Sequence, residues 1–434
     1  MKIAFVFPPI WPLHVDGSLQ IWNREVTARL SKTCRVIVYS GSFPVDDRDR
    51  ADEVADNGVT HHRLSTHWDS RLLKYLQLFC HAVRIKKPPF ASDFWYPWYA
   101  FRVALDIQKR GCDVVHVYNY PQFCPIIKYF NPKIRVVLNM HGELLTQVSF
   151  RNIYSRLTRV DAVISCSEFI SRAIRAKFPA IAGRCKTVPM GISTGALSTN
   201  KHLASDDSSP RQLLYVGRVS PEKGVHVLLE AFEIILRQYP DASLTIVGPE
   251  WIPPREYLAD LCLDRRVVEG FAHFYEGSYT EKLKDNLSPE AAKRVTFAGL
   301  IPHRDVPVYY ANADIFISPS FYESFGMSVI EAMAEGLPVV AVAGGALPDL
   351  ISDGSNGLLV GPSNPGALAR GVENLITNHE LRKSIACAGR EMVCKTFSFE
   401  SICSRLLEVY KGVLSCPFDS REAETSVQIS SFRC

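Results

Sequence analysis

The sequence predicts two doubly wound α/β domains, each a parallel sheet covered by helices, that face each other across a cleft. Three observations support this fold class: the chain length, the alternation of apolar runs with helix-length segments, and a polar break near the middle. With 434 residues the chain exceeds what one hydrophobic core usually organises, so we expect two domains of about 200 residues each. Hydrophobic residues make up 47% of the chain and charged residues 22%, as in ordinary globular proteins.

Short runs of β-branched and apolar residues recur in both halves of the chain. Such runs, separated by segments long enough for a helix, are typical of parallel strands that are buried on both faces. They lie at residues 2–7, 35–41, 114–118, 135–142, 162–167 and 186–191, and again at 212–218, 243–249, 295–300, 315–320, 338–342 and 356–360. Each half is therefore predicted to form its own sheet.

A segment rich in Ser, Thr, Asp and Gly separates the two halves. We expect ligands to lie in the cleft, because doubly wound sheets bind ligands at the carboxyl ends of their strands. The predicted division is an N-terminal domain over 1–191, a linker over 192–211, a C-terminal domain over 212–398, a helix over 399–414 that packs back on the N-terminal domain, and a disordered tail over 415–434.

Charge and cysteine usage exclude several classes of protein. The 49 basic and 45 acidic residues give a net charge of only +4, without the basic stripe of a nucleic-acid-binding protein. The 12 cysteines include no CxxC pair, which argues against structural zinc and a disulfide framework. The apolar run at 3–7 is too short for a signal-peptide core or a membrane span. We expect a cytoplasmic protein with reduced thiols that binds no nucleic acid.

The first candidate motif is LLYVGRVSPEKGVHVLLEAF. A predicted strand ends at Gly217, Ser220 is a suitable helix N-cap, and Pro221 suits the first helical position. Lys223 would then lie in the first helical turn, where a cation costs about 0.3–1 kcal/mol unless an anion is bound. Together with Arg218 it predicts a diphosphate clamp, in which Arg gives forked hydrogen bonds and Lys a point charge. The alternative is a solvated surface turn.

The second candidate motif is ADIFISPSFYESFGMSVIEAMAEGLPVVAVAGG, with a strand ending near Ser320 and a helix over about 325–335. Glu323 precedes this helix and Glu331 lies within it, 331 − 323 = 8 positions later, so we expect them to serve different parts of one site. Glu331 suits a diol such as a ribose, or else a local cap or ion pair, and Glu323 suits hydroxyls of a transferred group. Phosphate or sugar oxygens would be bound by the backbone amides of Phe325, Gly326, Met327 and Ser328.

These motifs closely resemble those of the retaining glycosyltransferases of family 4, in particular bacterial spore-coat and surface-polysaccharide members. The resemblance covers nearly the whole chain, because the family's amino-terminal landmarks are also matched in order by DGSLQIWNREVTARL, VVHVYNYPQF, VVLNMHGELL, DAVISCSEF and VPMGIS. The residues that match in the two motifs are Gly217, Arg218, Lys223, Gly224, Glu323 and Glu331, followed by EAMAEGLPVVAVAGG.

The resemblance implies a GT-B fold of two Rossmann-like domains and a nucleotide diphosphate sugar as donor. It places Arg218 and Lys223 on the diphosphate, Glu331 on the ribose, and Glu323 with the following amides on the sugar. His141 resembles the family histidine that reaches the sugar across the cleft, with a structural histidine bonded to backbone as the alternative. The implied reaction moves a hexose or N-acetylhexosamine from a UDP-sugar, or next a GDP-sugar, to an unknown hydroxyl acceptor. This reaction would serve the biosynthesis of a polysaccharide, a glycolipid or a natural product.

One position departs from the family pattern. The family usually has two glycines after the first strand, whereas this chain has Asp16-Gly17. Gly17 is expected to meet the donor, and Asp16 either alters the donor's approach or faces the acceptor. Glycosyltransferases that use a metal hold it with a DxD at a strand end, and the near match here, Asp47-Arg48-Asp49, is interpreted as a solvated loop. No metal and no cofactor are expected, and the lack of a GxGxxG after a strand disfavours a nicotinamide enzyme.

Two other classes of function remain as alternatives. A GT-B-shaped epimerase or phosphorylase would bind a similar donor but would need its own acid and base pair or a pyridoxal lysine. A non-catalytic coat or structural relative would have a decayed site, whereas Arg218, Lys223, Glu323 and Glu331 are all present.

Residues 71–87, RLLKYLQLFCHAVRIKK, mix apolar and basic side chains. This composition fits peripheral contact with an anionic membrane at its inner face, and the alternative is a covering helix with a basic outer side. The aromatic residues that follow are either core or acceptor-side: Phe94, Trp95, Tyr96, Trp98 and Tyr99.

Overall fold

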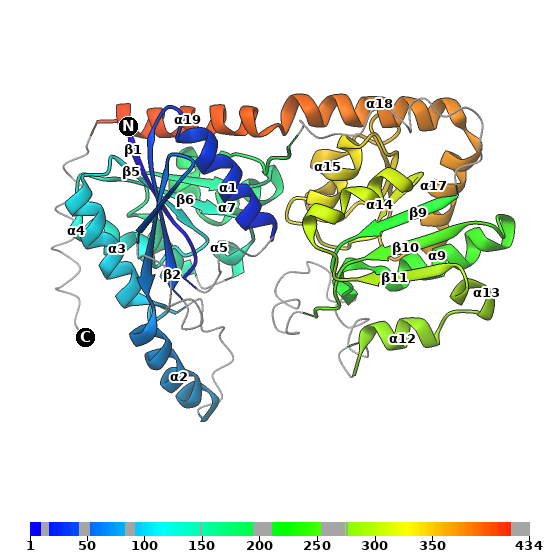
Figure 1. The fold of residues 1–434 in the computed structure, drawn as a ribbon, viewed down its shortest axis with the longest axis horizontal. Helices are drawn as coiled ribbons and strands as arrows, with labels where there is room; N and C mark the ends of the chain where they lie inside the picture. Colours follow the sequence, from blue (N-terminus) through cyan, green and yellow to red (C-terminus); the bar gives the residue numbers. More distant parts are fainter. Residues whose placement is uncertain are drawn as a thin grey trace.

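The computed structural model describes residues 1–9, 17–42, 53–82, 92–147, 150–193, 211–252, 274 and 277–417. These residues form two separate sheets, each covered by helices (Figure 1). The predicted fold class, two parallel-sheet α/β domains, is confirmed. Strands lie near all twelve of the predicted apolar runs.

The N-terminal sheet has eight strands in the order β3-β4-β2-β1-β5-β6-β7-β8. All neighbouring strands are parallel except β3 and β4. Every residue of β5 and β6 is buried, because helices cover both faces of the sheet. The strands are β1 (Lys2–Val6), β2 (Arg35–Ser42), β3 (Glu53–Asp56), β4 (Val59–Ser65), β5 (Val114–Tyr118), β6 (Arg135–Met140), β7 (Ala162–Ser165) and β8 (Cys185–Thr187).

The antiparallel hairpin of β3 and β4 is an element that the sequence analysis missed. Its strands carry many polar residues, so they lack the apolar runs that mark the others. The turn at Asn57-Gly58 has φ angles of 48° and 77°, the left-handed geometry that favours this residue pair. An Asn-Gly pair is the local signal that could have predicted the hairpin.

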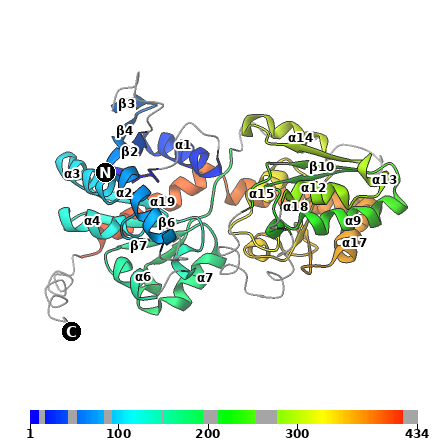
Figure 2. The same ribbon diagram turned by 90° about the horizontal axis from the view of Figure 1, so that it is seen from below.

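Helices cover both sides of the N-terminal sheet (Figure 2). Their bounds are α1 (Ser18–Leu30), α2 (His67–Ala82), α3 (Pro97–Arg110), α4 (Phe123–Phe130), α5 (Leu144–Gln147), α6 (Phe150–Leu157), α7 (Glu168–Lys177) and the 3-10 helix η2 (Pro179–Arg184). Of the aromatic residues near the start of α3, Trp95, Tyr96 and Tyr99 are buried, whereas Phe94 and Trp98 are exposed.

The C-terminal sheet has six strands in the order β11-β10-β9-β12-β13-β14, all of them parallel. Its strands are β9 (Gln212–Val216), β10 (Ser243–Val247), β11 (Val295–Gly299), β12 (Ile315–Ser318), β13 (Val339–Val342) and β14 (Leu358–Val360). Its helices are η3 (Pro221–Lys223), α9 (Val225–Gln238), α12 (Tyr279–Asp285), α13 (Pro289–Ala292), η5 (His303–Asp305), α14 (Pro307–Asn312), α15 (Met327–Ala334), α16 (Leu347–Leu350), α17 (Pro365–Thr377) and α18 (His379–Thr396).

Helix α19 (Phe399–Ser415) runs from the C-terminal half back along the N-terminal half (Figure 1). Its Tyr410 hydroxyl lies 2.7 Å from His116 Nδ1 of β5, in the buried core. The chain crosses between the halves a second time beside the start of α19, where the Ile192 N–H donates to Phe397 O at 2.8 Å. The two crossings therefore lie next to each other. Residues 194–210 of the predicted linker lie outside the described residues.

Candidate active site

The loop after β9 carries the first predicted motif. The Tyr215 hydroxyl donates to the Arg218 carbonyl at 2.6 Å, and the Val219 N–H donates to Pro249 O at 2.9 Å. Pro249 follows β10, the neighbour of β9. These bonds hold the loop at the carboxyl edge of the sheet, where ligands of doubly wound sheets bind.

The predicted helical turn does begin after Ser220, with Pro221 in its first position, but it is a short 3-10 helix and not the start of α9. Pro221 to Lys223 form a 3-10 turn and α9 begins only at Val225, because Gly224 takes the left-handed φ of 70° that interrupts the helix. The Ser220 hydroxyl donates to the side chain of Glu222 instead of capping a helix. A Cβ atom at position 224 would lie 2.2 Å from Pro319 O, so the glycine lets this loop approach the loop after β12.

Lys223 and Glu323 form an ion pair between these two loops, although they are 100 residues apart. Their side chains are 14% and 16% exposed. The Ser320 hydroxyl donates to the same Glu323 oxygen at 3.2 Å. The pair forms because β9 and β12 are neighbouring strands whose carboxyl ends meet. The two residues predicted to bind different parts of the donor thus lie in one site and contact each other.

Arg218 lies in the same loop as Lys223, with a more exposed side chain. Its Nη2 is 3.1 Å from the Glu222 carboxylate, and its guanidinium lies 4.6 Å from the centroid of the Trp251 ring. Its Nη1 is buried and has no hydrogen-bond partner among the described residues. A buried donor without an acceptor is costly, so this position fits an anion that binds beside the loop.

Glu331 faces away from the core on α15, whose neighbouring positions Val329 and Ile330 are buried. The Tyr310 hydroxyl donates to Glu331 Oε2 at 2.8 Å, and His303 Nε2 lies 3.3 Å from Oε1. Glu331 therefore has the local partners that the sequence analysis named as the alternative to ribose binding. Its side chain remains 20% exposed, so a diol could still reach the carboxylate.

Helix α15 begins at Met327, two residues later than predicted, because Gly326 takes a φ of 101°. The first bonds of the helix run from the Val329 and Ile330 N–H groups to Gly326 O. The amides of Phe325 to Ser328 precede these bonds and lie outside the helical ladder. The Glu323 side of this turn is packed tightly, since a Cβ atom on Gly345 would lie 2.2 Å from Glu323 O.

His141 follows β6 at the carboxyl edge of the N-terminal sheet. Its ring stacks on Tyr118, with centroids 5.9 Å apart, and its Nδ1 lies 3.0 Å from Met190 Sδ. A thioether can only accept, so Nδ1 carries the proton and Nε2 has the lone pair. Nε2 is buried without a partner among the described residues, and burial lowers the pKa of His141 to about 3. A neutral ring of this kind can accept a hydrogen bond from a hydroxyl.

We expect the free energy of unfolding to fall as the pH is lowered from 7 to 5. Burial lowers the pKa of both His116 and His141 to about 3 in the folded protein, whereas histidine in an unfolded chain protonates near pH 6.5. Below that pH the unfolded state binds more protons than the folded state. The loss should reach about 1 kcal/mol per pH unit for each histidine. Urea unfolding at both pH values measures it, and a His116→Gln variant with the same pH dependence as the wild type would contradict the assignment.

The two halves touch beside this histidine. Glu143 lies next to Tyr322, and burial raises the pKa of the Glu143 carboxyl. The Tyr322 ring packs edge-on against Phe169 with centroids 5.9 Å apart, and Cys166 Sγ lies 3.7 Å from Ser324 O. The loop that carries Glu323 is thereby in contact with the N-terminal half.

Comparison with known proteins assigns the family. The model of the glycosyl transferases group 1 matches residues 200–392, and the model of glycosyltransferase family 4 matches residues 48–195. The chain belongs to the GT-B glycosyltransferases of the family 4 type. It is 26% identical to spore coat protein SA of Bacillus subtilis over 95% of this chain and 99% of that protein.

Solved structures share the fold of this glycosyltransferase. Sucrose-phosphate synthase from Thermosynechococcus elongatus is 22% identical with a TM-score of 0.64, over 95% of this chain and 99% of that one. The Anabaena HepE protein, solved in complex with UDP and glucose, is 17% identical with a TM-score of 0.65, over 95% of this chain and 100% of that one. These likenesses establish the GT-B architecture.

The glycine predicted to meet the donor lies at the start of α1. Gly17 is the N-cap of this helix with φ −90° and ψ 155°, and β1 ends eleven positions earlier at Val6, 17 − 6 = 11. Asp16 and the charged segment Asp47-Arg48-Asp49 lie outside the described residues. Within the described part of the glycosyltransferase, no cluster of His, Cys, Asp and Glu side chains is arranged to hold a metal ion.

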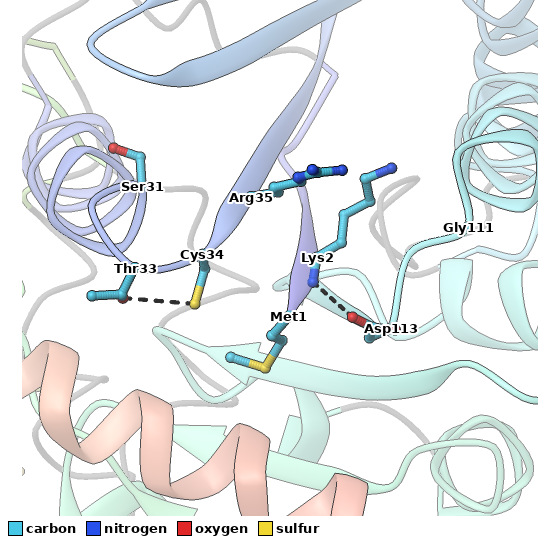
Figure 3. Close-up of a pocket in the computed structure, with 8 residues that line it drawn as sticks. All are labelled: Met1, Lys2, Ser31, Thr33, Cys34, Arg35, Gly111 and Asp113. Carbon is cyan, nitrogen blue, oxygen red and sulfur yellow. Dashed lines mark hydrogen bonds between the residues drawn. The ribbon is translucent and has the colours of Figure 1, made fainter.

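A polar pocket of about 460 Å³ lies at the opposite edge of the N-terminal sheet (Figure 3). The Lys2 N–H donates to Asp113 at 2.7 Å across the pocket. Arg35, at the start of β2, and Gly111, just after α3, also line it. None of the predicted site residues of the glycosyltransferase lines this pocket. The candidate active site is therefore at the carboxyl edge, where His141 and the two motifs lie.

Several side chains of the site were missed by the sequence analysis. Four of them contact predicted residues: Glu222, Trp251, His303 and Tyr310. The other two, Glu143 and Tyr322, lie next to each other where the two halves touch. For Glu222 and Tyr322 the neighbouring positions in the motifs were a usable signal. Contacts of the other four depend on strand order and could not be read from sequence.

Proposed function

We propose that the glycosyltransferase moves a hexose or N-acetylhexosamine from a UDP-sugar, or next a GDP-sugar, to a hydroxyl acceptor with retention at the anomeric carbon. The observation that carries the proposal is the meeting of the loops after β9 and β12, which brings Lys223 to Glu323. Arg218 lies beside them, and its Nη1 has no hydrogen-bond partner in the part of the chain that the structure describes. UDP is favoured as the nucleotide because the structure of HepE, which shares the fold, contains UDP and glucose.

In this proposal the donor lies on residues 212–398 and the acceptor on residues 1–191. Arg218 and Lys223 bind the diphosphate, and Glu331 binds the ribose, with Tyr310 and His303 holding its carboxylate in position. The sugar is held by Glu323 and by the amides of Phe325, Gly326, Met327 and Ser328. Gly17 borders the phosphates, and the neutral His141 ring accepts a hydrogen bond from a sugar hydroxyl.

The chemistry required of these residues is stabilisation of the leaving group. Cleavage of the bond between the sugar and the nucleotide diphosphate leaves positive charge on the sugar ring and negative charge on the phosphate. Lys223 and Arg218 would stabilise this negative charge, usually the largest contribution to catalysis. We propose that the acceptor attacks from the same face and that the leaving phosphate takes its proton, so that the protein supplies no base.

Binding of the diphosphate must compete with a contact that Lys223 makes within the protein. Lys223 donates to Glu323, so it has to exchange this carboxylate for the phosphate or bind both. The exchange also frees Glu323 to accept hydroxyl groups of the sugar. The ion pair itself keeps both of these largely buried charges hydrogen-bonded.

The proposal is tested by thermal unfolding with UDP, GDP, ADP and dTDP, followed by mass spectrometry of the products formed from the best donor. We expect UDP to raise Tm most, because a ligand that binds only the folded state stabilises it. The shift should be the same with and without EDTA, since the proposed clamp consists of cationic side chains and amides. Loss of the shift in EDTA would contradict the metal-free site.

Product analysis also separates the two alternative functions. An epimerase or phosphorylase would release an isomerised nucleotide sugar or a sugar phosphate instead of a glycoside. A coat or structural relative would neither bind nor hydrolyse any donor. Hydrolysis of a UDP-sugar to UDP and free sugar, with no other product, is the result that the transferase predicts in the absence of an acceptor.

We also propose that the protein works in the cytoplasm, at the inner face of a membrane. The cysteines whose side chains the structure describes are all unpaired, which fits a reducing compartment. Within the described residues, no helix is both long and apolar enough to cross a bilayer. Of the segment 71–87 proposed for peripheral contact, residues 71–82 lie in or at the end of α2 and residues 83–87 lie outside the described part.

A further inference from the structure

Large apolar side chains are exposed where α2 and α3 begin. Trp68 and Tyr75 of α2 are 65% and 72% exposed, and Trp98 of α3 is 46% exposed. Leu72 of α2 and Phe94, just before α3, are exposed as well. We call Trp68, Leu72, Tyr75, Phe94 and Trp98 the aromatic patch.

A buried carboxylate holds the two helix starts together. Asp69, only 1% exposed, accepts the backbone N–H groups of Trp98 and Tyr99 at 2.9 and 3.0 Å. This bond pair caps the start of α3, whose first residue is Pro97. Trp68 precedes Asp69 in the chain, and Trp98 donates to it. These hydrogen bonds therefore hold the backbone at both exposed tryptophans in place.

The exposed apolar residues of α2 lie on one face of the helix. Trp68, Leu72 and Tyr75 follow the i, i+4, i+7 spacing of a single helical face, while Leu73 is buried against the domain. Arg71 and Lys74 are exposed beside this face, and the Arg71 guanidinium lies 6.0 Å from the centroid of the Trp68 ring. An apolar stripe with flanking cations is typical of a helix that lies on an anionic membrane.

The acidic groups next to the patch do not offset these cations. Asp69 is buried and bonded to two amides, and the carboxylate of Asp93 pairs with Arg156 at 2.6 Å. Among the described residues, Arg71 and Lys74 form no salt bridge or hydrogen bond with an acidic side chain. The patch therefore presents net positive charge together with aromatic rings, the combination found at membrane interfaces.

The aromatic patch lies at the same edge of the sheet as the candidate active site. Helix α2 starts just after the carboxyl end of β4, which is parallel to β2, and His141 follows the carboxyl end of β6. Figure 1 shows α2 projecting from the N-terminal half on this side, away from α19. A partner that bound the patch would therefore lie against the half of the protein to which we assign the acceptor.

We propose that the aromatic patch docks the glycosyltransferase on an anionic phospholipid bilayer, with Trp68, Tyr75 and Trp98 in the interface and Arg71 and Lys74 on the lipid phosphates. Lipid docking does not depend on the proposed transfer reaction. Only one consequence rests on that function, namely that the acceptor is a hydroxyl compound carried in the same bilayer.

The experiment is co-sedimentation of the full chain with vesicles of phosphatidylcholine, with and without phosphatidylglycerol, in the absence of donor. We expect binding to the anionic vesicles that weakens in high salt. Arg71→Glu/Lys74→Glu should weaken it by tenfold or more, because each cation near an anionic surface contributes about fivefold. A Trp68→Ser/Tyr75→Ser variant should weaken it at all salt concentrations.

Matched variants at the opposite edge control for charge and exposure. Lys109 lies in the last turn of α3 and Lys133 precedes β6, so Lys109→Glu/Lys133→Glu makes the same charge change away from the patch. Tyr129 of α4 is 79% exposed, and Tyr129→Ser is the aromatic control. The controls should bind vesicles like the wild type.

Three results would overturn the proposal: no binding of the wild type to anionic vesicles, equal losses in the patch and control variants, or patch variants that dissociate an oligomer in lipid-free sedimentation. The last result would identify the patch as a protein interface. Because no donor is present, failure of lipid binding leaves the proposed transferase function untouched. Conversely, a protein that binds vesicles but no nucleotide would overturn the function and leave the patch.

Discussion

Replacing Lys223 by methionine is expected to lower kcat of sugar transfer by about 100- to 1000-fold, the usual cost of removing one group that stabilises transition-state charge. In the proposed reaction this ammonium stabilises the departing diphosphate, whose charge grows as the glycosidic bond breaks. Steady-state rates at saturating donor measure the effect. A kcat near the wild-type value would contradict the clamp.

The same change has a structural consequence that must be separated from catalysis. Glu323 is the partner of Lys223 and is mostly buried, so Lys223→Met leaves a carboxylate without its cation. We expect a loss of about 3 kcal/mol in the free energy of unfolding of the empty protein, as is usual when one member of a buried pair is removed. The double variant Lys223→Met/Glu323→Gln should regain much of this stability but no activity. Lys293→Met, a change at an exposed lysine of the C-terminal half, is the control for both measurements.

The two glutamates are expected to fail in different assays. Glu331→Gln should weaken binding of UDP itself by about 1–3 kcal/mol, because a charged hydrogen bond to the ribose is lost. Glu323→Gln should not weaken UDP binding, since the sugar that it holds is absent and Lys223 is released from its carboxylate partner. Its defect should appear in turnover of the intact sugar donor, where the orientation of the sugar matters most.

Calorimetry with UDP and transfer rates with the UDP-sugar distinguish these outcomes. Tyr310→Phe is a useful companion, because it removes the hydroxyl that holds Glu331 Oε2 but keeps the carboxylate. It should weaken UDP binding less than Glu331→Gln does. If Glu323→Gln abolished UDP binding while Glu331→Gln bound normally, the two roles would be reversed. If neither change altered binding or turnover, the proposed site would be wrong.

The sequence by itself determined the two sheets and the places of the two motifs. Buried parallel strands need continuous apolar runs, and such runs are local features that can be read along the chain. The hairpin of β3 and β4 was not predicted because its strands are largely polar, although Asn57-Gly58 marked its turn. It also placed the start of α9 too early, because the left-handed Gly224 interrupts a segment with good helix-start residues.

Only the tertiary structure decided which side chains of the site contact one another. Lys223 meets Glu323 because β12 lies next to β9 in the sheet, an order that no local pattern specifies. Glu331 contacts Tyr310 and His303, which come from helices outside its motif, for the same reason. The apolar and basic composition of α2 was visible in the sequence. Which of its residues are exposed depends on how Leu73 and Asp69 pack, because burial is a property of the assembled fold.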